Sequence, residues 1–258
     1  MRDAMSMFGR ARMTAPAAAS GVAVHAWQVD LDGIPYTSAR QLLSADECAR
    51  ADSFRFDVHR VRFVAGRAAL RVLLGRELQI AARDVVFVTG RFGKPALAPS
   101  LGTSLRFNLS HSENRALIAT AWGADLGVDL EYLDAATDME ELAVTVFSTG
   151  ERAELAALPE PLRVAGFFSA WTRKEAYLKA RGEGLSRSLQ DFDVRVDPRL
   201  APALLDARHA PGDVLRWSWS APATPPAFAA AICVEGVAHT LVSHPAVDAR
   251  SGHELFAG

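Results

Sequence analysis

Two acidic side chains, Asp129 and Glu131, stand two residues apart in the segment GVDLEY. Because side chains alternate along a strand, both carboxylates lie on one face, and Val128 and Leu130 point the other way into a core. Neighbouring carboxylates repel each other unless a cation lies between them. The pair is therefore either an exposed strand face or a Mg²⁺ site, because this hard cation binds carboxylate oxygens and keeps waters and substrate phosphates as further ligands.

A second set of side chains lies in the segment AWTRKEAYLKARGEGL, residues 170–185. Trp171, Glu175 and Lys179 are spaced by four and share one face of a helix. A surface ion pair between Glu175 and Lys179 would contribute only about 0.3–0.5 kcal/mol. Alternatively, Glu175 is a third metal ligand or a base, and Lys179 contacts a phosphate with its compact, three-donor ammonium group. The spacing alone leaves both interpretations open.

Three further features could bind an anion. Ser110 and His111 lie in NLSHSEN, which we expect to form a turn whose hydroxyls and amides could hold a phosphate oxygen. Lys94 lies in the turn GKP, although histidines and lysines on turns are more often ordinary surface residues. A basic helix is either a solvated face or a phosphate clamp, for which the guanidinium fork is well suited. With little acid near them in the sequence, its arginines are Arg60, Arg62, Arg67, Arg71 and Arg76.

The elements that would position these residues in the first half are an alternating strand, helices and a hairpin. The alternation in VAVHAWQVDL predicts a strand over residues 22–31. Ser44 and Glu47 have the spacing of a capping box at the start of a helix. Strands are predicted in DVVFVTG, on either side of the SHSEN turn, and in LGVDLEYL. A long helix over residues 58–78 has an apolar stripe formed by Val61, Val64, Ala65, Ala68 and Val72.

The second half follows a similar order. A helix is predicted in MEELAVTVF, and Ser148 with Glu151 forms a second capping box before STGERAELAAL. The long helix comes next, followed by strands in FDVRVD, VLRWSWSA and FAAAICVEGV. Each half thus has helices and a small antiparallel sheet, which predicts an α+β fold of two similar lobes. We expect a flexible tail over residues 1–20, one lobe over 21–124 and another over 125–258, joined at GAD.

Composition excludes several classes of protein. The formal net charge of −2 over 258 residues gives no support for a nucleic-acid partner. Cys48 and Cys233 lack His or Cys neighbours at metal spacing, so we expect buried, reduced thiols and neither a disulfide framework nor a zinc site. We see no signal peptide and no bilayer-spanning segment, and we expect a cytoplasmic protein that starts at Met1, Met7 or Met13.

The motifs GKP, FNLSHS, GVDLE and FFSAWTRKEAYLKARGEGL occur in this order along the chain. Together they closely resemble the 4′-phosphopantetheinyl transferases, in particular the larger, pseudo-dimeric type that activates the non-ribosomal peptide and polyketide synthases of secondary metabolite biosynthesis. The resemblance runs from about Phe54 to Val194. The pattern W-x-x-K-E-x-x-x-K-x-x-G-x-G-L is complete from Trp171 to Leu185. It implies two lobes in a pseudo-two-fold arrangement, with the active site at their interface.

The resemblance also implies an activity. The enzyme would transfer the 4′-phosphopantetheine arm of coenzyme A to a serine hydroxyl of an apo carrier protein and release adenosine 3′,5′-bisphosphate. The carrier would belong to a fatty-acid, polyketide or non-ribosomal peptide synthase. By resemblance, Asp129, Glu131 and Glu175 hold Mg²⁺, and Lys179 contacts the pyrophosphate. Because one chain supplies both lobes, we expect a monomer.

Other site residues are carried over from the same motifs. Ser110, His111 and Lys94 would line the coenzyme A site. Arg62 falls where the family has an arginine that contacts adenine and phosphate, and Arg50 falls where it often has a lysine. The sequence departs from the family where Glu47 replaces a second basic residue near the 3′-phosphate, a change for which Arg55 or Arg60 could compensate. Glu151 matches an acid near the family's site whose role is open.

The implied chemistry agrees with elementary electrostatics. Attack on a pyrophosphate requires its negative charge to be neutralised, which Mg²⁺, Lys179, His111 and Lys94 would do. The attacking serine needs a base, which is either Glu175 or a water activated by the metal. The alternative function is a coenzyme A-binding or carrier-docking module without catalysis. Three mutually repelling carboxylates argue against such a module, and a phosphatase is disfavoured because the sequence shows no second metal cluster.

Overall fold

The computed structural model describes residues 21–90, 92–182, 184 and 187–248 of the chain. The expected tail over residues 1–20, with the alternative starts Met7 and Met13, lies outside the described residues. So do Glu183 and Leu185 at the end of the long motif. None of the helices in the described part of the chain has the length and apolarity needed to cross a membrane. Cys233 is buried, as expected, whereas Cys48 is half-buried, and both are free thiols.

The first sheet has four strands in the order β11-β1-β5-β4. Strand β1 (Val22–Asp30), β5 (Arg115–Trp122) and β4 (Leu105–Ser112) pair antiparallel, with Val24 opposite Ala121. Strand β11 (His239–Ser243) pairs parallel to β1 at the other edge, with Val22 opposite His239. A strand from late in the chain therefore completes the sheet of the first half, which the predicted division at residue 124 does not include.

Helix α3 (Asp57–Leu78) packs on this sheet and carries the predicted apolar stripe. Val64, Ala65, Ala68 and Val72 are buried, and Val61 lies at the half-buried margin. The remaining elements of this half are two short helices and a hairpin: α1 (Tyr36–Arg40), α2 (Ala45–Asp52), β2 (Phe87–Thr89) and β3 (Pro95–Leu97).

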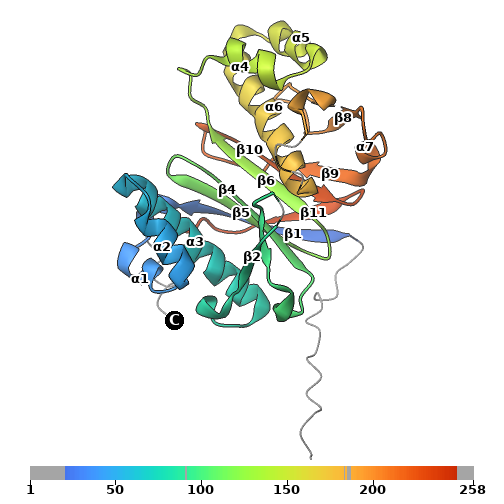
Figure 1. The fold of residues 1–258 in the computed structure, drawn as a ribbon. Coiled ribbons are helices and arrows are strands. Elements are labelled where there is room, and N and C mark those ends of the chain that lie inside the picture. Colours follow the sequence, from blue (N-terminus) through green and yellow to red (C-terminus); the bar gives the residue numbers. More distant parts are fainter. Residues whose placement is uncertain (1–20, 91, 183, 185–186, 249–258) are drawn as a thin grey trace, which may run out of the picture.

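The second sheet has the strand order β6-β10-β9. It consists of β6 (Leu126–Tyr132), β10 (Phe228–Glu235) and β9 (Trp217–Ser220), and α6 (Glu160–Arg181) packs against β6 and β10. The other elements are α4 (Met139–Val146), α5 (Thr149–Ala157), β7 (Phe192–Val194), β8 (Leu204–Ala207) and α7 (Asp213–Arg216). Figure 1 shows the strands across the middle of the molecule, with α1–α3 and α4–α6 on opposite sides. The mixed α and β content agrees with the sequence-based expectation.

Both predicted capping boxes are confirmed. Ser44 Oγ accepts from the Glu47 amide at 3.3 Å and Glu47 Oε2 accepts from the Ser44 amide at 2.9 Å, at the start of α2. Ser148 and Glu151 make the same reciprocal bonds, at 3.1 and 2.9 Å, at the start of α5. Each box satisfies two amides that a helix end leaves without a partner. The sequence therefore predicts both helix starts correctly.

The predicted turn over SHSEN is too long. Strand β4 continues to Ser112 and β5 begins at Arg115, so only Glu113 and Asn114 connect them. Two residues suffice for a hairpin, and Glu113 adopts the left-handed backbone conformation (φ +49°) that such turns require. Ser110 and His111 consequently lie on a strand, and the Ser110 hydroxyl has its partner, Asp129, in the neighbouring strand β6.

Gly127 permits a close approach between α6 and β6. A Cβ atom added at this position would collide with the carbonyl oxygen of Ala176 and the amide nitrogen of Ala180. Only glycine removes this obstacle, because every other residue carries a Cβ. The backbone of α6 therefore lies directly on β6, and the side chains of Lys179 and Asp129 are brought together.

Candidate active site at the contact of β4, β6 and α6

The predicted acidic residues lie on β6 and α6 as the sequence indicates. Asp129 and Glu131 share one face of β6, and Val128 and Leu130 are buried on the other. Asp129 is only 1% exposed, so its carboxylate has almost no access to water. Glu175 and Glu131 are half-buried. Burying a charged carboxylate costs free energy unless a cation or hydrogen-bond donor compensates for the lost water, so Asp129 requires such a partner.

Lys179 supplies that compensation. Its Nζ lies 2.5 Å from Asp129 Oδ1 and donates to Ser110 Oγ at 3.0 Å, while Ser110 Oγ donates to the same Oδ1 at 2.8 Å. The alternative of a surface ion pair between Glu175 and Lys179 is wrong, because the partner of Lys179 is an acid on β6. The spacing of four within the helix places both residues on the side that faces the strand.

One oxygen of this network has no partner. Asp129 Oδ2 is buried and accepts no hydrogen bond from the described part of the chain. Burial, followed by the charge of Asp129, raises the pKa of Glu131 to about 7 and also raises the pKa of Glu175. The three carboxylates are thus close enough to oppose one another's ionisation. A buried, unpartnered carboxylate oxygen beside two further carboxylates is an arrangement that suits a hard cation.

The described residues do not form a ready-made metal site. Among them, no group of three His, Cys, Asp or Glu side chains is arranged to hold a metal ion. The ammonium of Lys179 neutralises the charge of Asp129. Ser112 Oγ donates a hydrogen bond to Glu131 Oε2 at 2.9 Å. The donor chemistry of Asp129, Glu131 and Glu175 nevertheless fits Mg²⁺, because carboxylate oxygens are ligands that this hard cation prefers.

Replacing Glu131 by glutamine should stabilise the metal-free protein at alkaline pH. The folded protein keeps the Glu131 proton up to about pH 7, whereas the unfolded chain loses it near the ordinary value of 4.5. The contribution of this group to stability therefore falls as the pH rises between these values, and ionised Glu131 is destabilising above pH 7. Glutamine cannot ionise, so we expect the free energy of unfolding to rise by about 1–3 kcal/mol at pH 8.

Chemical denaturation in EDTA at pH 8 and at pH 5 measures this effect. The gain should largely disappear at pH 5, where folded Glu131 is already protonated. Glu140→Gln, at an exposed position of α4, is the matched control and should change neither value. Equal stability of Glu131→Gln and the unmodified protein at pH 8 would show that Glu131 ionises without cost in the folded state.

A cleft of about 270 Å³ opens beside this network. It is lined from α6 by Glu175 and Lys179, from β4 by Asn108 and Leu109, and from the turn at residues 92–95. A larger cleft of about 960 Å³ shares part of this lining, including the turn. Together the two clefts have the size of sites that bind ligands as large as a nucleotide.

Lys94 lines both clefts, but its ammonium is already committed. Its Nζ donates to the carbonyl oxygens of Leu126 at 2.9 Å and Lys179 at 2.7 Å. Burial lowers its pKa. Lys94 therefore joins the end of α6 to the start of β6, and its first role in the fold is to hold these two elements together.

Arg62 on α3 and His111 on β4 are two further basic side chains predicted for the site. Arg62 pairs with Asp32, at 2.9 and 3.1 Å, and with Glu113 at 3.2 Å. Partial burial, followed by the charges of Lys179, His59 and Arg62, lowers the pKa of His111. His111 is therefore close enough to Lys179 and Arg62 for their charges to disfavour its protonated form.

The expectation that the basic helix has little acid to balance it is wrong. Its arginines find acids from elements that are distant in sequence: Asp32 and Glu113 for Arg62, and Glu47 for Arg67 and Arg71. Glu47 is buried and accepts from Arg71 Nε at 2.7 Å, in addition to its role in the capping box. Glu47 is therefore a structural acid of the interior, paired with Arg67 and Arg71.

The remaining basic residues near α2 and α3 have local partners. Arg50 is exposed on α2, with its guanidinium carbon 5.6 Å from the centre of the Phe63 ring. Arg60 pairs with Asp57 at 2.6 Å, and Arg55 lies 5.3 Å from the ring centre of Phe56. The structure thus does not bring Arg50, Arg55 and Arg60 into the network around Asp129.

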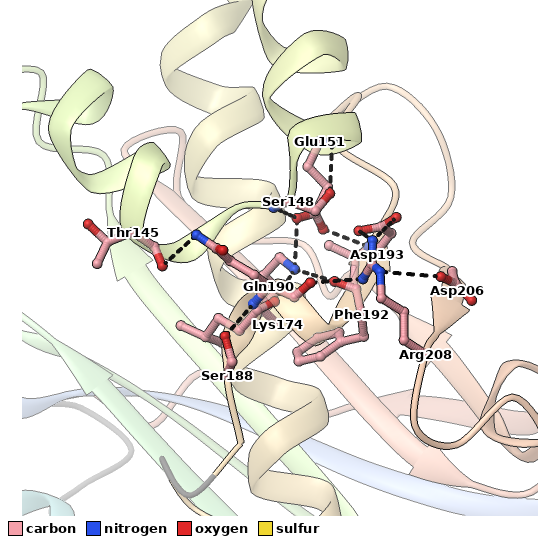
Figure 2. A network of polar contacts seen from close by, with 12 residues as sticks. Thr145, Ser148, Glu151, Lys174, Ser188, Gln190, Phe192, Asp193, Asp206 and Arg208 are labelled. Atoms are coloured by element: carbon pink, nitrogen blue, oxygen red, sulfur yellow. Dashed lines mark hydrogen bonds and ion pairs between the residues drawn. The ribbon is translucent and has the colours of Figure 1, made fainter.

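Glu151 and Lys174 form a buried ion pair of 2.8 Å away from the cleft (Figure 2). The other two donors of Lys174 Nζ reach the carbonyl oxygens of Leu189 at 2.7 Å and Phe192 at 2.6 Å, and Glu151 Oε1 accepts from the Val194 amide at 2.8 Å. Both residues therefore fix the segment that follows the long motif. In the sequence, the only local signal at Glu151 is the spacing of the second capping box, and this spacing does not reveal a lysine partner.

Comparison with known proteins supports a family assignment. Residues 125–233 match the 4′-phosphopantetheinyl transferase superfamily. The chain is 42% identical over 179 residues to the 4′-phosphopantetheinyl transferase HetI of Nostoc sp., which covers 68% of this chain and 75% of that protein. It is 36% identical over 148 residues to a putative 4′-phosphopantetheinyl transferase, slr0495, of Synechocystis sp., covering 57% and 60%.

Among solved structures, a holo-(acyl-carrier-protein) synthase from Bacillus anthracis in complex with CoA (3′,5′-ADP) has a TM-score of 0.34 and 26% identity, covering 43% of this chain and 94% of that chain. The family assignment rests on the sequence relatives, because the match to HetI extends over three quarters of that protein's length. The chain belongs to the 4′-phosphopantetheinyl transferase family, and it is an enzyme that transfers phosphopantetheine from coenzyme A to carrier proteins.

Proposed function

We propose that the transfer takes place where β4, β6 and α6 meet, and that Asp129, Glu131 and Glu175 hold Mg²⁺ there. The observation that carries this proposal is the buried oxygen Asp129 Oδ2, which accepts no hydrogen bond from the described residues. When bound, Mg²⁺ supplies positive charge to the pyrophosphate of coenzyme A and so assists departure of the leaving group. The adjoining clefts provide room for the nucleotide.

The basic side chains of the site bind and orient the pyrophosphate. Lys179 lies within reach of Asp129 and Ser110 and offers the pyrophosphate oxygens a charged donor. The lowered pKa of His111 keeps its ring neutral at pH 7, so it acts toward phosphate as a hydrogen-bond donor without full charge. Ser110 and Lys94 hold Lys179 and the backbone around it in place.

The chemical step exchanges one phosphorus–oxygen bond for another. The serine oxygen of the carrier attacks the phosphorus of the phosphopantetheine arm, the bond to the bridging oxygen breaks, and adenosine 3′,5′-bisphosphate leaves. We assign the serine proton to Glu175, because burial and the nearby Asp129 raise its pKa toward the range that suits a general base. Proximity and charge neutralisation supply the rest of the rate increase.

The two halves are proposed to be lobes related by a pseudo-two-fold axis, over residues 21–124 and 125–258. Each half contributes one helix of 22 residues, α3 and α6, and most strands of one sheet, in support of this arrangement, although the first sheet takes its edge strand β11 from the second half. Since the proposed ligands all come from one chain, we propose a monomer that acts in the cytoplasm. Its substrates would be carriers of fatty-acid, polyketide or non-ribosomal peptide synthases.

Replacing Arg62 by alanine should weaken coenzyme A binding about tenfold and leave the rate at saturation nearly unchanged, since the charged hydrogen bonds to phosphate that it would make are each worth about 1.5–3 kcal/mol. The substitution also leaves Asp32 and Glu113 without their cation, and both acids then repel phosphate. Calorimetric titration with coenzyme A measures the affinity. Arg76→Ala, at an exposed position of the same helix, is the control. An unchanged affinity of Arg62→Ala would show that Arg62 forms a surface ion pair only.

Intact mass measurement of an apo carrier protein tests the proposed function. The carrier is incubated with the enzyme and coenzyme A, with Mg²⁺ or with EDTA. A gain of one phosphopantetheine arm that requires Mg²⁺ is expected, and a panel of fatty-acid, polyketide and peptide carriers sets the specificity. An equal gain in EDTA would exclude the proposed metal dependence.

A further inference from the structure

Strands β4 and β6 lie side by side, yet each is the edge strand of a different sheet. Side chains at alternate positions of β4 provide the hydrogen bonds between them. Asn108 Oδ1 accepts from the Val128 amide at 2.8 Å, Ser110 Oγ donates to Asp129 Oδ1 at 2.8 Å, and Ser112 Oγ donates to Glu131 Oε2 at 2.9 Å. Because alternate residues share one face of a strand, three successive positions contact the strand that carries two acids of the site.

Both hydrogen-bonding capacities of the Ser112 hydroxyl are used. Its oxygen accepts from the Tyr132 amide at 3.0 Å, and its hydrogen is directed to Glu131 Oε2. A hydroxyl that is held by a backbone amide has little freedom to turn away from the carboxylate. Ser112 thus fixes the orientation of Glu131. The Glu131 side chain is half-buried, and without this bond it could adopt several rotamers.

The same division of oxygens occurs in the neighbouring acid. Ser110 and Lys179 both contact Asp129 Oδ1, and Asp129 Oδ2 is left without a hydrogen bond. In Glu131 the bond from Ser112 is made to Oε2, so Oε1 is the oxygen that remains for a ligand. In each of the two acids on β6, one carboxylate oxygen therefore accepts a hydrogen bond from a serine of β4, and the other oxygen is available to a ligand.

We infer that Ser112 is a positioning residue for the transfer reaction, which orients Glu131 for metal binding by fastening Oε2 and presenting Oε1. The inference rests on the proposed role of Glu131 as a ligand. Residues that orient metal ligands contribute strongly to affinity, and their loss weakens metal binding about 10–100-fold. Ser112 touches no reacting atom, so its effect is exerted through Glu131 alone.

Ser112→Thr and Ser112→Val form the decisive pair, because the two side chains have nearly the same shape and differ by the hydroxyl. Binding of Mn²⁺, as a stand-in for Mg²⁺, is measured by electron paramagnetic resonance on the full chain with coenzyme A and without a carrier protein. We expect Ser112→Thr to bind Mn²⁺ within about threefold of the unmodified enzyme and Ser112→Val to bind it at least about tenfold more weakly.

Two controls separate orientation from folding. Ser218→Ala removes a half-buried hydroxyl in the second sheet, which lies 2.7 Å from His239 Nδ1 and 3.3 Å from Val234 O, away from the acids, and it should leave Mn²⁺ binding unchanged. Melting temperatures show which variants are folded, and Ser112→Ala replaces Ser112→Val in the comparison if the valine variant does not fold. Unchanged Mn²⁺ affinity in the folded variant without the hydroxyl overturns the inference.

Asp129→Asn distinguishes failure of the inference from failure of the proposed site. If Asp129→Asn loses Mn²⁺ and Ser112→Val keeps it, only the role of Ser112 is wrong. If Asp129→Asn keeps the affinity of the unmodified enzyme, the proposed metal site is wrong and the role of Ser112 is overturned with it.

Discussion

Replacing Gly127 by alanine should lower the free energy of unfolding by about 3 kcal/mol or more, and it should also disable the site. The added Cβ collides with the backbone of α6 at Ala176 and Ala180, and backbone atoms cannot turn aside as a flexible side chain can. Either the helix moves away from β6 or the protein unfolds, an effect in the range of severe core substitutions. Movement of α6 would break the ion pair between Lys179 Nζ and Asp129 Oδ1, which lie 2.5 Å apart in the structure.

Chemical denaturation with Gly150→Ala as the matched control tests this expectation. A Cβ at Gly150, on α5, meets the Ser148 hydroxyl at an ordinary 3.7 Å, so alanine should be neutral or stabilise the helix by about 1 kcal/mol. Coenzyme A binding of any folded Gly127→Ala protein reports on the site. Equal stability of Gly127→Ala and the unmodified protein would show that α6 is not held against β6 as the structure describes.

Replacing Glu175 by glutamine should reduce the transfer rate about 10²–10⁴-fold, the range that a general base contributes. Glutamine keeps the size of the side chain and can neither accept the serine proton nor supply a carboxylate to the metal. The fold should be preserved, because removing this charge relieves repulsion with Asp129. Single-turnover transfer to an apo carrier, followed by mass, measures the rate.

The control for this substitution lies on the same helix. Glu160 is exposed in the first turn of α6, and Glu160→Gln should transfer at the rate of the unmodified enzyme. A melting temperature at or above that of the unmodified protein confirms that Glu175→Gln is folded. Near-normal turnover in that protein would remove Glu175 from the reaction.

Features that depend on neighbours in the sequence were predicted correctly. The capping boxes at Ser44 and Ser148 involve residues three apart, and the alternation that buries Val128 and Leu130 spans one strand. The helical stripe on α3 is local in the same way. In each case the sequence spacing itself determines which side chains meet.

Features that depend on distant partners were not predictable. Arg62 was interpreted without Asp32 and Glu113, which come from other parts of the chain, and the i,i+4 neighbour of Lys179 proved less important than Asp129 on β6. The polar run around Ser110 was interpreted as a turn because its partners on β6 are invisible in the local sequence. The placement of the proposed ligands could be predicted, but the bonds that organise them required the fold.

The pairing of β1 with β11 has a consequence for the order of folding. Strand β1 is synthesised first, but its partner β11 is synthesised only after α3, α6 and the strands β2–β10. Contacts between residues so far apart in sequence slow folding, and the unpaired edge of β1 is exposed to association with other chains in the meantime. Synthesis of the first half alone would therefore give a sheet with an open edge, and the two halves should fold far better as one continuous chain than as separate pieces.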